Sequence, residues 1–419
     1  MILPNEYLIV NLELRKIGMK KSQQDPQTLV VLGGMFALVM AMGIGRFAYT
    51  PLLPLMQREF KFGESMAGVL ASVNYLGYLL GALACRPLVR PRTRNTLFRL
   101  SLVAIIVAVA AMGLTSSIAA WLLWRFLAGV ASAGAFVISS TVVLDALAEN
   151  QRTAWSGYFY SGVGVGIALS GLCVAPLDSW SGAHGAWIGF GILCLPLAWA
   201  SWRWVVAPDL PQRKVAGTAG DTPAASRQLL PWLTAAYFCE GLGYIVSGTF
   251  MVSILRGTSS WSAGNRAWII VGLTAAIFSI IWPYIARRAG LVRALIGAHG
   301  LQALGIVLPV VSADVRIAYL GTLLFGGTFM GITVLSLTLG KGLEPQHSGR
   351  VISTLTVVFG LGQIAGPTLA GLLAARTSSF SLPLVLAALV VASGGLLLAA
   401  NWLFPLLAPR YVLPVRKQN

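Results

Sequence analysis

Long apolar runs separated by short polar segments follow one another along almost the whole chain. Each run is long enough for the about 20 residues that a helix needs to cross the hydrocarbon core of a bilayer. A membrane barrel would instead give alternating segments of about ten residues. The pattern therefore predicts an all-α polytopic membrane protein with twelve spans, at residues 28–56, 64–84, 97–115, 118–143, 154–176, 185–206, 231–255, 267–286, 293–311, 316–340, 350–374 and 380–404.

The composition supports this prediction. Of the 419 residues, 57% are apolar and only 10% are charged, whereas a soluble domain has about 25% charged residues. A soluble enzyme, a disordered chain and a disulfide scaffold are thereby excluded. Phosphate-loop, HExxH, CxxC and GxSxG motifs do not occur, so we expect neither an enzyme nor a cofactor nor a metal. The four cysteines lie in or beside apolar runs, at positions Cys85, Cys173, Cys194 and Cys239.

The net charge of +17 comes from 30 Lys and Arg against 13 Asp and Glu. On a soluble domain such an excess would suggest nucleic-acid binding. Here most basic residues lie in alternate loops, and the richest is the 85–99 loop. Only a few fall on the opposite side, namely Arg58, Lys61, Arg256, Arg266, Arg316 and Arg376. Cytoplasmic loops of membrane proteins are rich in Lys and Arg. We therefore expect both termini in the cytoplasm, a place in the cell inner membrane, and no nucleic-acid partner.

Two sets of glycines repeat along the chain. Gly162, Gly166 and Gly171 recur 200 residues later as Gly362, Gly366 and Gly371, and the Gly-Ile-Gly at 43–45 recurs 198 residues later as Gly-Leu-Gly. This indicates a tandem duplication of six helices with the same orientation. We expect a cytoplasmic tail at 1–27, with Met19 as an alternative start, bundles at 28–206 and 231–404, a cytoplasmic linker at 207–230 and a tail at 405–419. Parallel repeats place substrate between the halves near the midplane, which favours a secondary transporter.

Several motifs resemble the major facilitator superfamily. Residues 81–86 (GALACR) resemble its G-x-L-A-D-R loop, with Cys85 in place of the acidic residue. Arg125 begins an R-x-x-x-G motif similar to that of proton-coupled members. Residues 362–371 (GQIAGPTLAG) resemble the antiporter glycine motif. The segments GIGRFAYTPLLP at 43–54 and EGLGY at 240–244 resemble the largely uncharacterised YbfB/YjiJ-like branch. The resemblance implies a transporter that works by alternating access, with a cavity lined by helices one, four, seven and ten.

Three charged residues lie deep inside predicted helices: Arg46, Arg125 and Glu240. A charge at the bilayer centre costs at least about 2.5 to 3.5 kcal/mol, so such residues usually face a cavity and have a function. A carboxylate held between apolar surroundings and a nearby guanidinium can take up and release a proton. Two arginines favour an anionic substrate. The structural alternatives are a permanent pairing of Glu240 with an arginine, and bonding of Arg125 to backbone carbonyls within the N-terminal bundle.

Uncharged residues on the same helices are further candidates. Tyr49 and Tyr244 lie one turn after Arg46 and Glu240 and offer a ring with a hydroxyl to an amphiphilic solute. Asn74 and Gln363 are polar candidates whose commoner use is hydrogen bonding between helices. The only predicted intramembrane histidine, His299, lies on the ninth helix, which the resemblance makes peripheral, so we expect it to be structural. The glycine pairs Gly162/Gly166 and Gly362/Gly366, with Pro367, suggest either static packing or a pivot.

Together these observations predict a monomeric secondary transporter that exports a small organic solute, anionic or amphiphilic, in exchange for protons. Glu240 would carry the proton, and Arg46 and Arg125 would orient the substrate. Two alternatives stay open: uptake of a small organic anion by proton symport, and a non-transporting membrane sensor or binding protein.

Overall fold

The computed structural model describes residues 26–85, 91–149, 152, 155–206, 224–258, 261–312 and 314–403. These residues form helices joined by short connections. The bounds in the first half of the chain are α2 Pro26–Leu38, the π-helix η1 Val39–Phe47, α3 Tyr49–Phe60, α4 Glu64–Ala84, α5 Pro91–Met112, α6 Ile118–Glu149 and α7 Ser156–Trp204. In the second half they are α8 Ala224–Thr258, α9 Trp261–Ala289, α10 Leu291–Val311, α11 Val315–Leu343, the 3₁₀ helix η3 Pro345–His347, α12 Ser348–Thr377 and α13 Ser381–Leu403.

These helices provide twelve candidate membrane spans, which confirms the predicted number. The first span, Gln27–Phe60, runs without a break through α2, η1 and α3, whereas α7 contains two spans. The chain turns back inside α7 at Ser181 and Gly182, and the φ angle of Gly182 is +57°, a conformation that glycine adopts easily. The predicted tails and most of the predicted linker, 207–223, lie outside the described residues.

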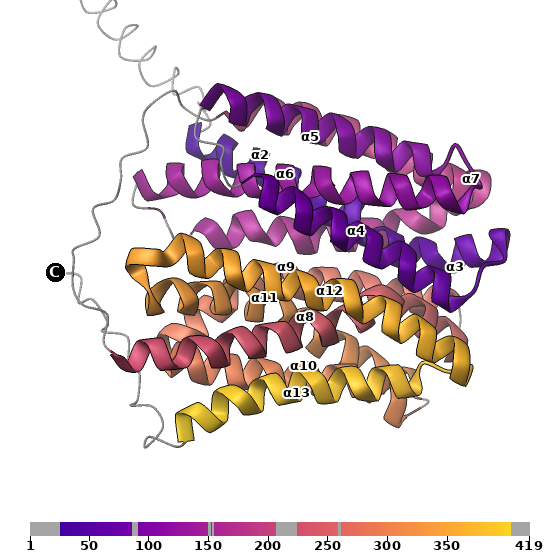
Figure 1. Cartoon of the computed structure of the whole chain (residues 1–419). Coiled ribbons are helices and arrows are strands. Elements are labelled where there is room, and N and C mark those ends of the chain that lie inside the picture. Colours follow the sequence, from indigo (N-terminus) through magenta and orange to yellow (C-terminus); the bar gives the residue numbers. More distant parts are fainter. Residues whose placement is uncertain are drawn as a thin grey trace, which may run out of the picture.

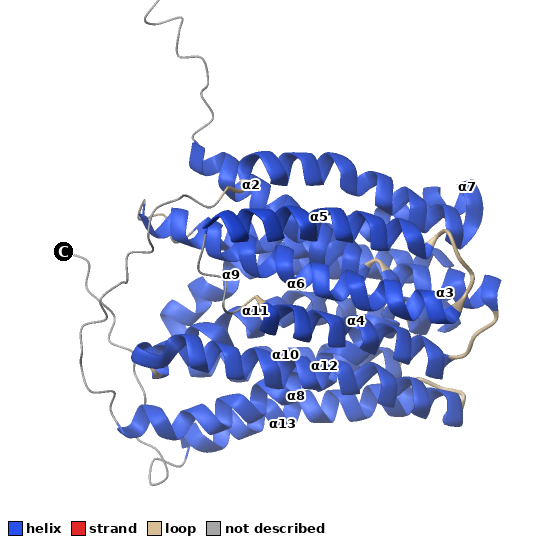
Figure 2. Ribbon diagram, turned by 45° about the horizontal axis from the view of Figure 1, so that its top comes forward, coloured by secondary structure: helices blue, strands red, loops and turns tan. Residues whose placement is uncertain are grey.

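The long helices lie side by side in one bundle, with α2 to α7 along one side and α8 to α13 along the other (Figures 1 and 2). We call these two sets the N-terminal half and the C-terminal half. Because successive spans alternate in direction, the bundle has two ends, which we name after the two ends of the first span. The Pro26 end also holds the C-terminus of α4 and the N-terminus of α12. The Phe60 end also holds the N-terminus of α4 and the C-terminus of α12.

The outside of the bundle is apolar. Large aliphatic and aromatic side chains are more than half exposed there, among them Leu100, Leu123, Leu172, Trp199 and Leu389. A soluble protein rarely exposes so continuous an apolar surface, and lipid chains would cover it in a bilayer. The composition that excluded a soluble domain is therefore explained by where these residues lie.

The two halves are held together at the Phe60 end. The Thr50 hydroxyl donates to the Gly248 carbonyl at 2.6 Å, and the Thr368 hydroxyl donates to the Ser72 hydroxyl at 2.8 Å. One buried apolar core includes residues of both halves. A second core, which contains Leu233, Leu339 and Val351, belongs to the C-terminal half alone and lies toward the Pro26 end.

A cavity of about 540 Å³ lies at the Pro26 end of the C-terminal half. It is lined by one face of α12, from Gly349 and Arg350 through Ser353 and Thr354 to Val357 and Val358. The halves also touch toward the Pro26 end, where the Ser279 hydroxyl donates to the Gly157 carbonyl at 3.4 Å, so the cavity is a local hollow beside α12.

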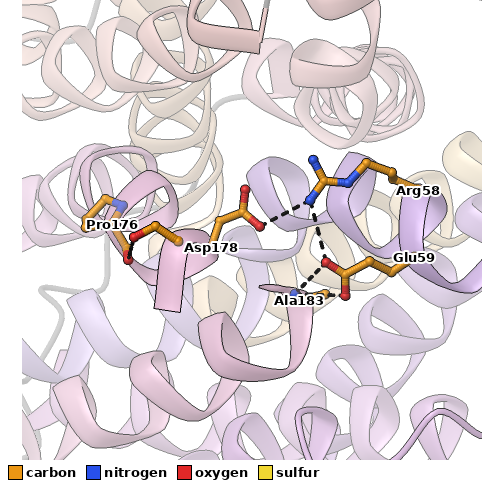
Figure 3. A network of polar contacts seen from close by, with 6 residues as sticks. Arg58, Glu59, Pro176, Asp178 and Ala183 are labelled. Atoms are coloured by element: carbon orange, nitrogen blue, oxygen red, sulfur yellow. Dashed lines mark hydrogen bonds and ion pairs between the residues drawn. The ribbon is translucent and has the colours of Figure 1, made fainter. Parts of the chain in front are cut away.

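Exposed charges reinforce the Phe60 end of the N-terminal half (Figure 3). Arg58 lies 3.3 Å from the Asp178 carboxylate and 3.6 Å from that of Glu59. Both oxygens of Glu59 accept from the Ala183 backbone N–H at 3.0 Å. A carboxylate at the start of a helix is stabilised by the helix dipole, so Glu59 caps the sixth span directly after the turn at Gly182. The three intramembrane charges take no part in this network.

Candidate functional site

Arg46 lies on η1, at about the middle of the first span. A π-helix is rare and often marks a functional site, and the apolar pattern alone predicted an ordinary helix here. The Arg46 side chain is only 2% exposed, and its guanidinium carbon lies 4.5 Å from the ring centre of Tyr75 and 4.7 Å from that of Tyr78, both on α4. Its Nε and Nη2 atoms find no acceptor among the described residues. Arg46 is therefore a buried cation with two free donors.

Tyr244 occupies the equivalent position in the second repeat, 198 residues after Arg46. It lies on α8, and its hydroxyl is close enough to Arg46 and Glu240 to feel both charges. The Gln363 side-chain amide, from α12, donates a hydrogen bond to this hydroxyl. Two of the predicted polar candidates, Tyr244 and Gln363, are thus brought together opposite Arg46, where the two halves face each other.

Tyr244 belongs to a continuous series of stacked rings in the C-terminal half, which we call the aromatic stack. Tyr237 lies on Phe359 at 4.5 Å and 17°, and Phe359 lies on Tyr244 at 5.5 Å and 13°. Phe329 follows at 5.8 Å and 5°, and Phe325 at 5.8 Å and 18°. The rings come from α8, α11 and α12, so no single helix shows the series in its sequence. Only Tyr244 was predicted.

Glu240 lies on α8 and is completely buried. Its Oε1 accepts from the Gln302 amide on α10 at 2.7 Å, and its Oε2 has no partner among the described residues. No basic side chain in the described ranges lies within ion-pair distance of it. The alternative in which Glu240 is permanently paired with an arginine is therefore not the arrangement in this structure.

Gln302 is a site residue that sequence reasoning missed. It lies one turn after His299 on the helix that was expected to be peripheral. His299 itself is buried, and its Nδ1 lies 2.8 Å from the Leu295 carbonyl within its own helix. The available signal was the amide of Gln302 in an otherwise apolar span, because such a group needs a partner there.

Arg125, on α6, lies inside the N-terminal half. Its Nε donates to the Leu70 carbonyl at 3.3 Å and its Nη1 to the Gly45 carbonyl at 3.5 Å. Its guanidinium carbon lies 4.5 Å from the ring centre of Tyr49. These contacts are those of the structural alternative, in which Arg125 bonds to backbone carbonyls.

Tyr49 and Asn74 belong to the same buried network. The Tyr49 hydroxyl donates to the Ala67 carbonyl at 3.0 Å, and the Asn74 amide donates to the Arg125 carbonyl at 2.8 Å. The network ties the first, second and fourth spans together. For Tyr49, Asn74 and Arg125 the contacts thus favour positioning of the helix that carries Arg46 over direct contact with a substrate.

The predicted glycine pairs pack helices within each half. A Cβ added at Gly162 would lie 2.6 Å from the Met35 carbonyl oxygen, and one at Gly166 would lie 2.7 Å from the Cα of Gly43. In the second repeat, a Cβ at Gly362 or Gly366 would lie 2.6 Å from backbone atoms of Leu242. These contacts correspond to the packing alternative.

Other glycines allow close contact between the halves. A Cβ at Gly164, on α7, would lie 2.5 Å from the Gly272 carbonyl oxygen on α9, and one at Gly272 would lie 2.6 Å from the Gly164 carbonyl oxygen. Gly68 on α4 directly faces the Pro367 carbonyl on α12. Of the residues predicted for a pivot, only Pro367 lies at such a crossing between the halves.

Comparison with known proteins agrees with this architecture. Residues 38–399 match the family described as "Uncharacterised MFS-type transporter YbfB". The chain is 24% identical to the uncharacterised MFS-type transporter YceJ of Bacillus subtilis (strain 168), over 82% of this chain and 89% of that protein. It is also 24% identical to the class D tetracycline resistance protein of Salmonella ordonez, over 83% of this chain and 90% of that protein.

The nucleoside transporter NupG has a similar solved structure. Its TM-score is 0.67 at 12% identity, over 89% of this chain and 99% of the NupG chain. At this identity the likeness shows the fold, which is the twelve-helix major facilitator fold. With the match over residues 38–399 and the duplicated six-helix bundles, it follows that the chain belongs to the YbfB family of MFS-type transporters.

Proposed function

We propose that this transporter couples the export of a small organic solute, anionic or amphiphilic, to the movement of protons across the cell inner membrane. One observation carries the proposal: the buried charges of Arg46 and Glu240 do not neutralise each other. Within the part of the chain that the structure describes, Arg46 keeps two donors without acceptors, and Glu240 keeps one oxygen without a donor. Buried charges without partners are costly, so each is suited to bind something that arrives and leaves.

Arg46 is the proposed solute-binding residue. It lies where the two halves face each other, and its free donors suit an anionic or strongly polar group. Arg125, Tyr49 and Asn74 support the backbone of its helix and are assigned a positioning role. Tyr244 and Gln363 complete the site from the C-terminal half.

Glu240 is the proposed proton carrier. A carboxylate that is buried without a cation is costly in its ionised form, and a bound proton removes that cost. The charge of Glu240 reaches Tyr244, one turn further along α8, and Tyr244 also feels Arg46. Binding or loss of a proton at Glu240 can therefore affect the solute site at Arg46 through Tyr244, which lies near both residues.

Export is the proposed direction because tetracycline resistance proteins are among the relatives. Alternating access is supported by the family match and by the hydrogen bonds that join the two halves toward the Phe60 end. We propose that the Pro26 end faces the cytoplasm, since Arg92, Arg203, Arg287, Arg288 and Arg350 lie there and basic residues favour that side. The proposed unit is a monomer in the bilayer.

A two-step experiment tests the proposal. A thermal-shift screen of the purified protein against organic acids and antibiotics, tetracycline included, supplies a solute. Its transport is then measured in proteoliposomes with an imposed pH gradient, for the wild type and for Glu240→Gln. The matched control is Glu59→Gln, the same change in a carboxylate at the Phe60 end. Glu240→Gln is expected to lose gradient-driven transport while Glu59→Gln retains it. Full gradient coupling in Glu240→Gln would refute the proposed role.

Proton symport is a second candidate, and the separation of the two charges favours it. Because Arg46 and Glu240 lie in different halves and are not paired, an anion and a proton can be bound together. A bound anion repels an ionised carboxylate, so each ligand should promote binding of the other. A pH-sensitive dye inside proteoliposomes separates the candidates. Solute entry acidifies the lumen in symport and makes it alkaline in antiport.

A further inference from the structure

We propose that the solute is an aromatic carboxylate, held at its carboxylate by Nε and Nη2 of Arg46 and at its ring by the aromatic stack. This inference rests on the proposed function, because it names the chemical class of the solute for the same site. It adds a requirement for a flat, unsaturated body and a requirement for two acceptor oxygens in one plane.

The first argument is the identity of the two free donors. The Nε–H and one Nη2–H of a guanidinium point in the same direction within its plane, at a separation that matches the two oxygens of a carboxylate. These are the two Arg46 nitrogens that lack acceptors among the residues placed in the structure. A carbonyl or an alcohol would satisfy only one of them, whereas a carboxylate satisfies both and also the charge.

The second argument is the way in which the Arg46 side chain is held. The rings of Tyr75 and Tyr78, at 4.5 Å and 4.7 Å, attract the guanidinium through its positive charge. Such contacts restrict the orientation of the guanidinium plane and leave the donors at its edge free. An arginine that is already oriented loses less entropy when it binds a planar partner.

The third argument is the surface opposite Arg46. The aromatic stack is a wall of near-parallel rings from three helices. Its member Tyr244 lies near enough to Arg46 to feel the charge of the guanidinium. A solute whose carboxylate is held by Arg46 would therefore place its body against Tyr244. Aromatic rings gain from offset or edge contacts with one another beyond simple burial, which favours an aromatic over a saturated body.

Isothermal titration of the purified protein in detergent tests the inference with three probes of similar size. They are 2-naphthoate, 2-naphthamide, which lacks the charge, and decahydro-2-naphthoate, which lacks the aromatic rings. We expect 2-naphthoate to bind roughly 10- to 100-fold more tightly than the amide, as for a charged hydrogen-bonded pair. Against the saturated acid we expect roughly a 3- to 10-fold preference.

Variants assign each preference to a side chain. Arg46→Lys keeps the charge but loses the pair of coplanar donors, and should lose most of the preference for naphthoate over the amide. Tyr244→Leu should lose the preference for the aromatic over the saturated acid and keep the preference for charge. The matched control is Arg99→Gln, because Arg99 also lies over an aromatic ring, 4.9 Å from that of Trp202, but away from the site. Thermal melting and binding of the amide show that each variant is folded.

Three results would overturn the inference: no binding of 2-naphthoate by the wild type, equal binding of the three probes, or unchanged selectivity in Arg46→Lys. None of these concerns proton coupling, which is measured with a pH gradient and Glu240→Gln. A transporter that couples to protons but prefers neutral or saturated solutes would keep the proposed function and refute the inference. Selective naphthoate binding without any gradient-driven transport would keep the inference about the solute and refute the proposed proton coupling.

Discussion

Gly164 and Gly166 lie two residues apart on α7 but face different parts of the molecule. Gly164 meets Gly272 of the C-terminal half, and Gly166 meets Gly43 of its own half. An alanine at either position introduces the same methyl group against backbone atoms. A comparison of Gly164→Ala with Gly166→Ala therefore distinguishes the effect of the contact between the halves from the effect of packing within the N-terminal half.

The size of the effect follows from the distances. A Cβ at Gly164 would lie 2.5 Å from the Gly272 carbonyl oxygen, whereas ordinary contacts begin at 3.4 Å. The two backbones would have to separate by about 1 Å, and overpacking of this kind costs typically about 1 to 3 kcal/mol. If the cost falls on the state that is closed at the Phe60 end, the equilibrium shifts about 5- to 150-fold toward the other state.

The assay reports opening of the Phe60 end. Thr249 is 1% exposed in the closed structure, and its hydroxyl lies 3.5 Å from that of Tyr75 in the other half. In a background without the four native cysteines, a Thr249→Cys reporter should react slowly with a membrane-impermeant maleimide. Gly164→Ala should speed the reaction about 5- to 150-fold, whereas Gly166→Ala should lower the melting temperature without this acceleration. Equal labelling rates in both variants would refute the reasoning.

Three further predictions concern single side chains. Thr50→Val removes the hydroxyl that donates to the Gly248 carbonyl at 2.6 Å and should speed labelling of the Thr249→Cys reporter about 2- to 12-fold. Thr50→Ser keeps the hydroxyl and should not speed it, so equal labelling rates in the two variants would contradict the role of this bond. Arg125→Lys, in which the lysine cannot reach both carbonyls, should lower the melting temperature and leave the solute KM nearly unchanged. Arg46→Lys should instead raise the solute KM and leave the melting temperature nearly unchanged. A raised KM at a wild-type melting temperature in Arg125→Lys would assign Arg125 to the solute. Gln302→Leu should reduce pH-driven transport up to about tenfold. The double variant with Glu240→Gln should transport no less than Glu240→Gln alone, because the amide acts through that carboxylate. A further loss in the double variant would show an independent role of Gln302.

The apolar pattern predicts the spans well because a bilayer imposes one length on every helix. The helices are nevertheless longer than the predicted spans at the Pro26 end. The α5 helix begins at Pro91, not at residue 97, and α6 ends at Glu149, not at residue 143. The extra turns of α5 are polar, and those of α6 carry Asp145 and Glu149, so a hydropathy pattern does not include them in a span. In the same way, the apolar pattern carries no sign that Val39–Phe47 winds as a π-helix.

The candidate site could be predicted only in part. Buried charge in an apolar span is a strong signal, and it identified Arg46 and Glu240. The partners could not be predicted in the same way, because Gln302, Phe359 and Phe329 come from other helices and each is unremarkable in its own span. Glycine spacing likewise showed which helices pack closely, but it does not show which neighbour each glycine faces. The contact of Gly164 with Gly272 between the halves was therefore not predicted, although Gly166 was identified two residues away.

The arginine at position 46 and the tyrosine at position 244 occupy one site of a duplicated bundle, and this single difference breaks the symmetry of the pair. The proposed solute would have only one way to lie between them, with its charged end toward the first repeat and its body toward the second. Recognition of charge and recognition of shape would then be encoded in separate copies of the same ancestral unit. Changes on α11 and α12 could alter which molecules are accepted while the requirement for a negative charge stays intact.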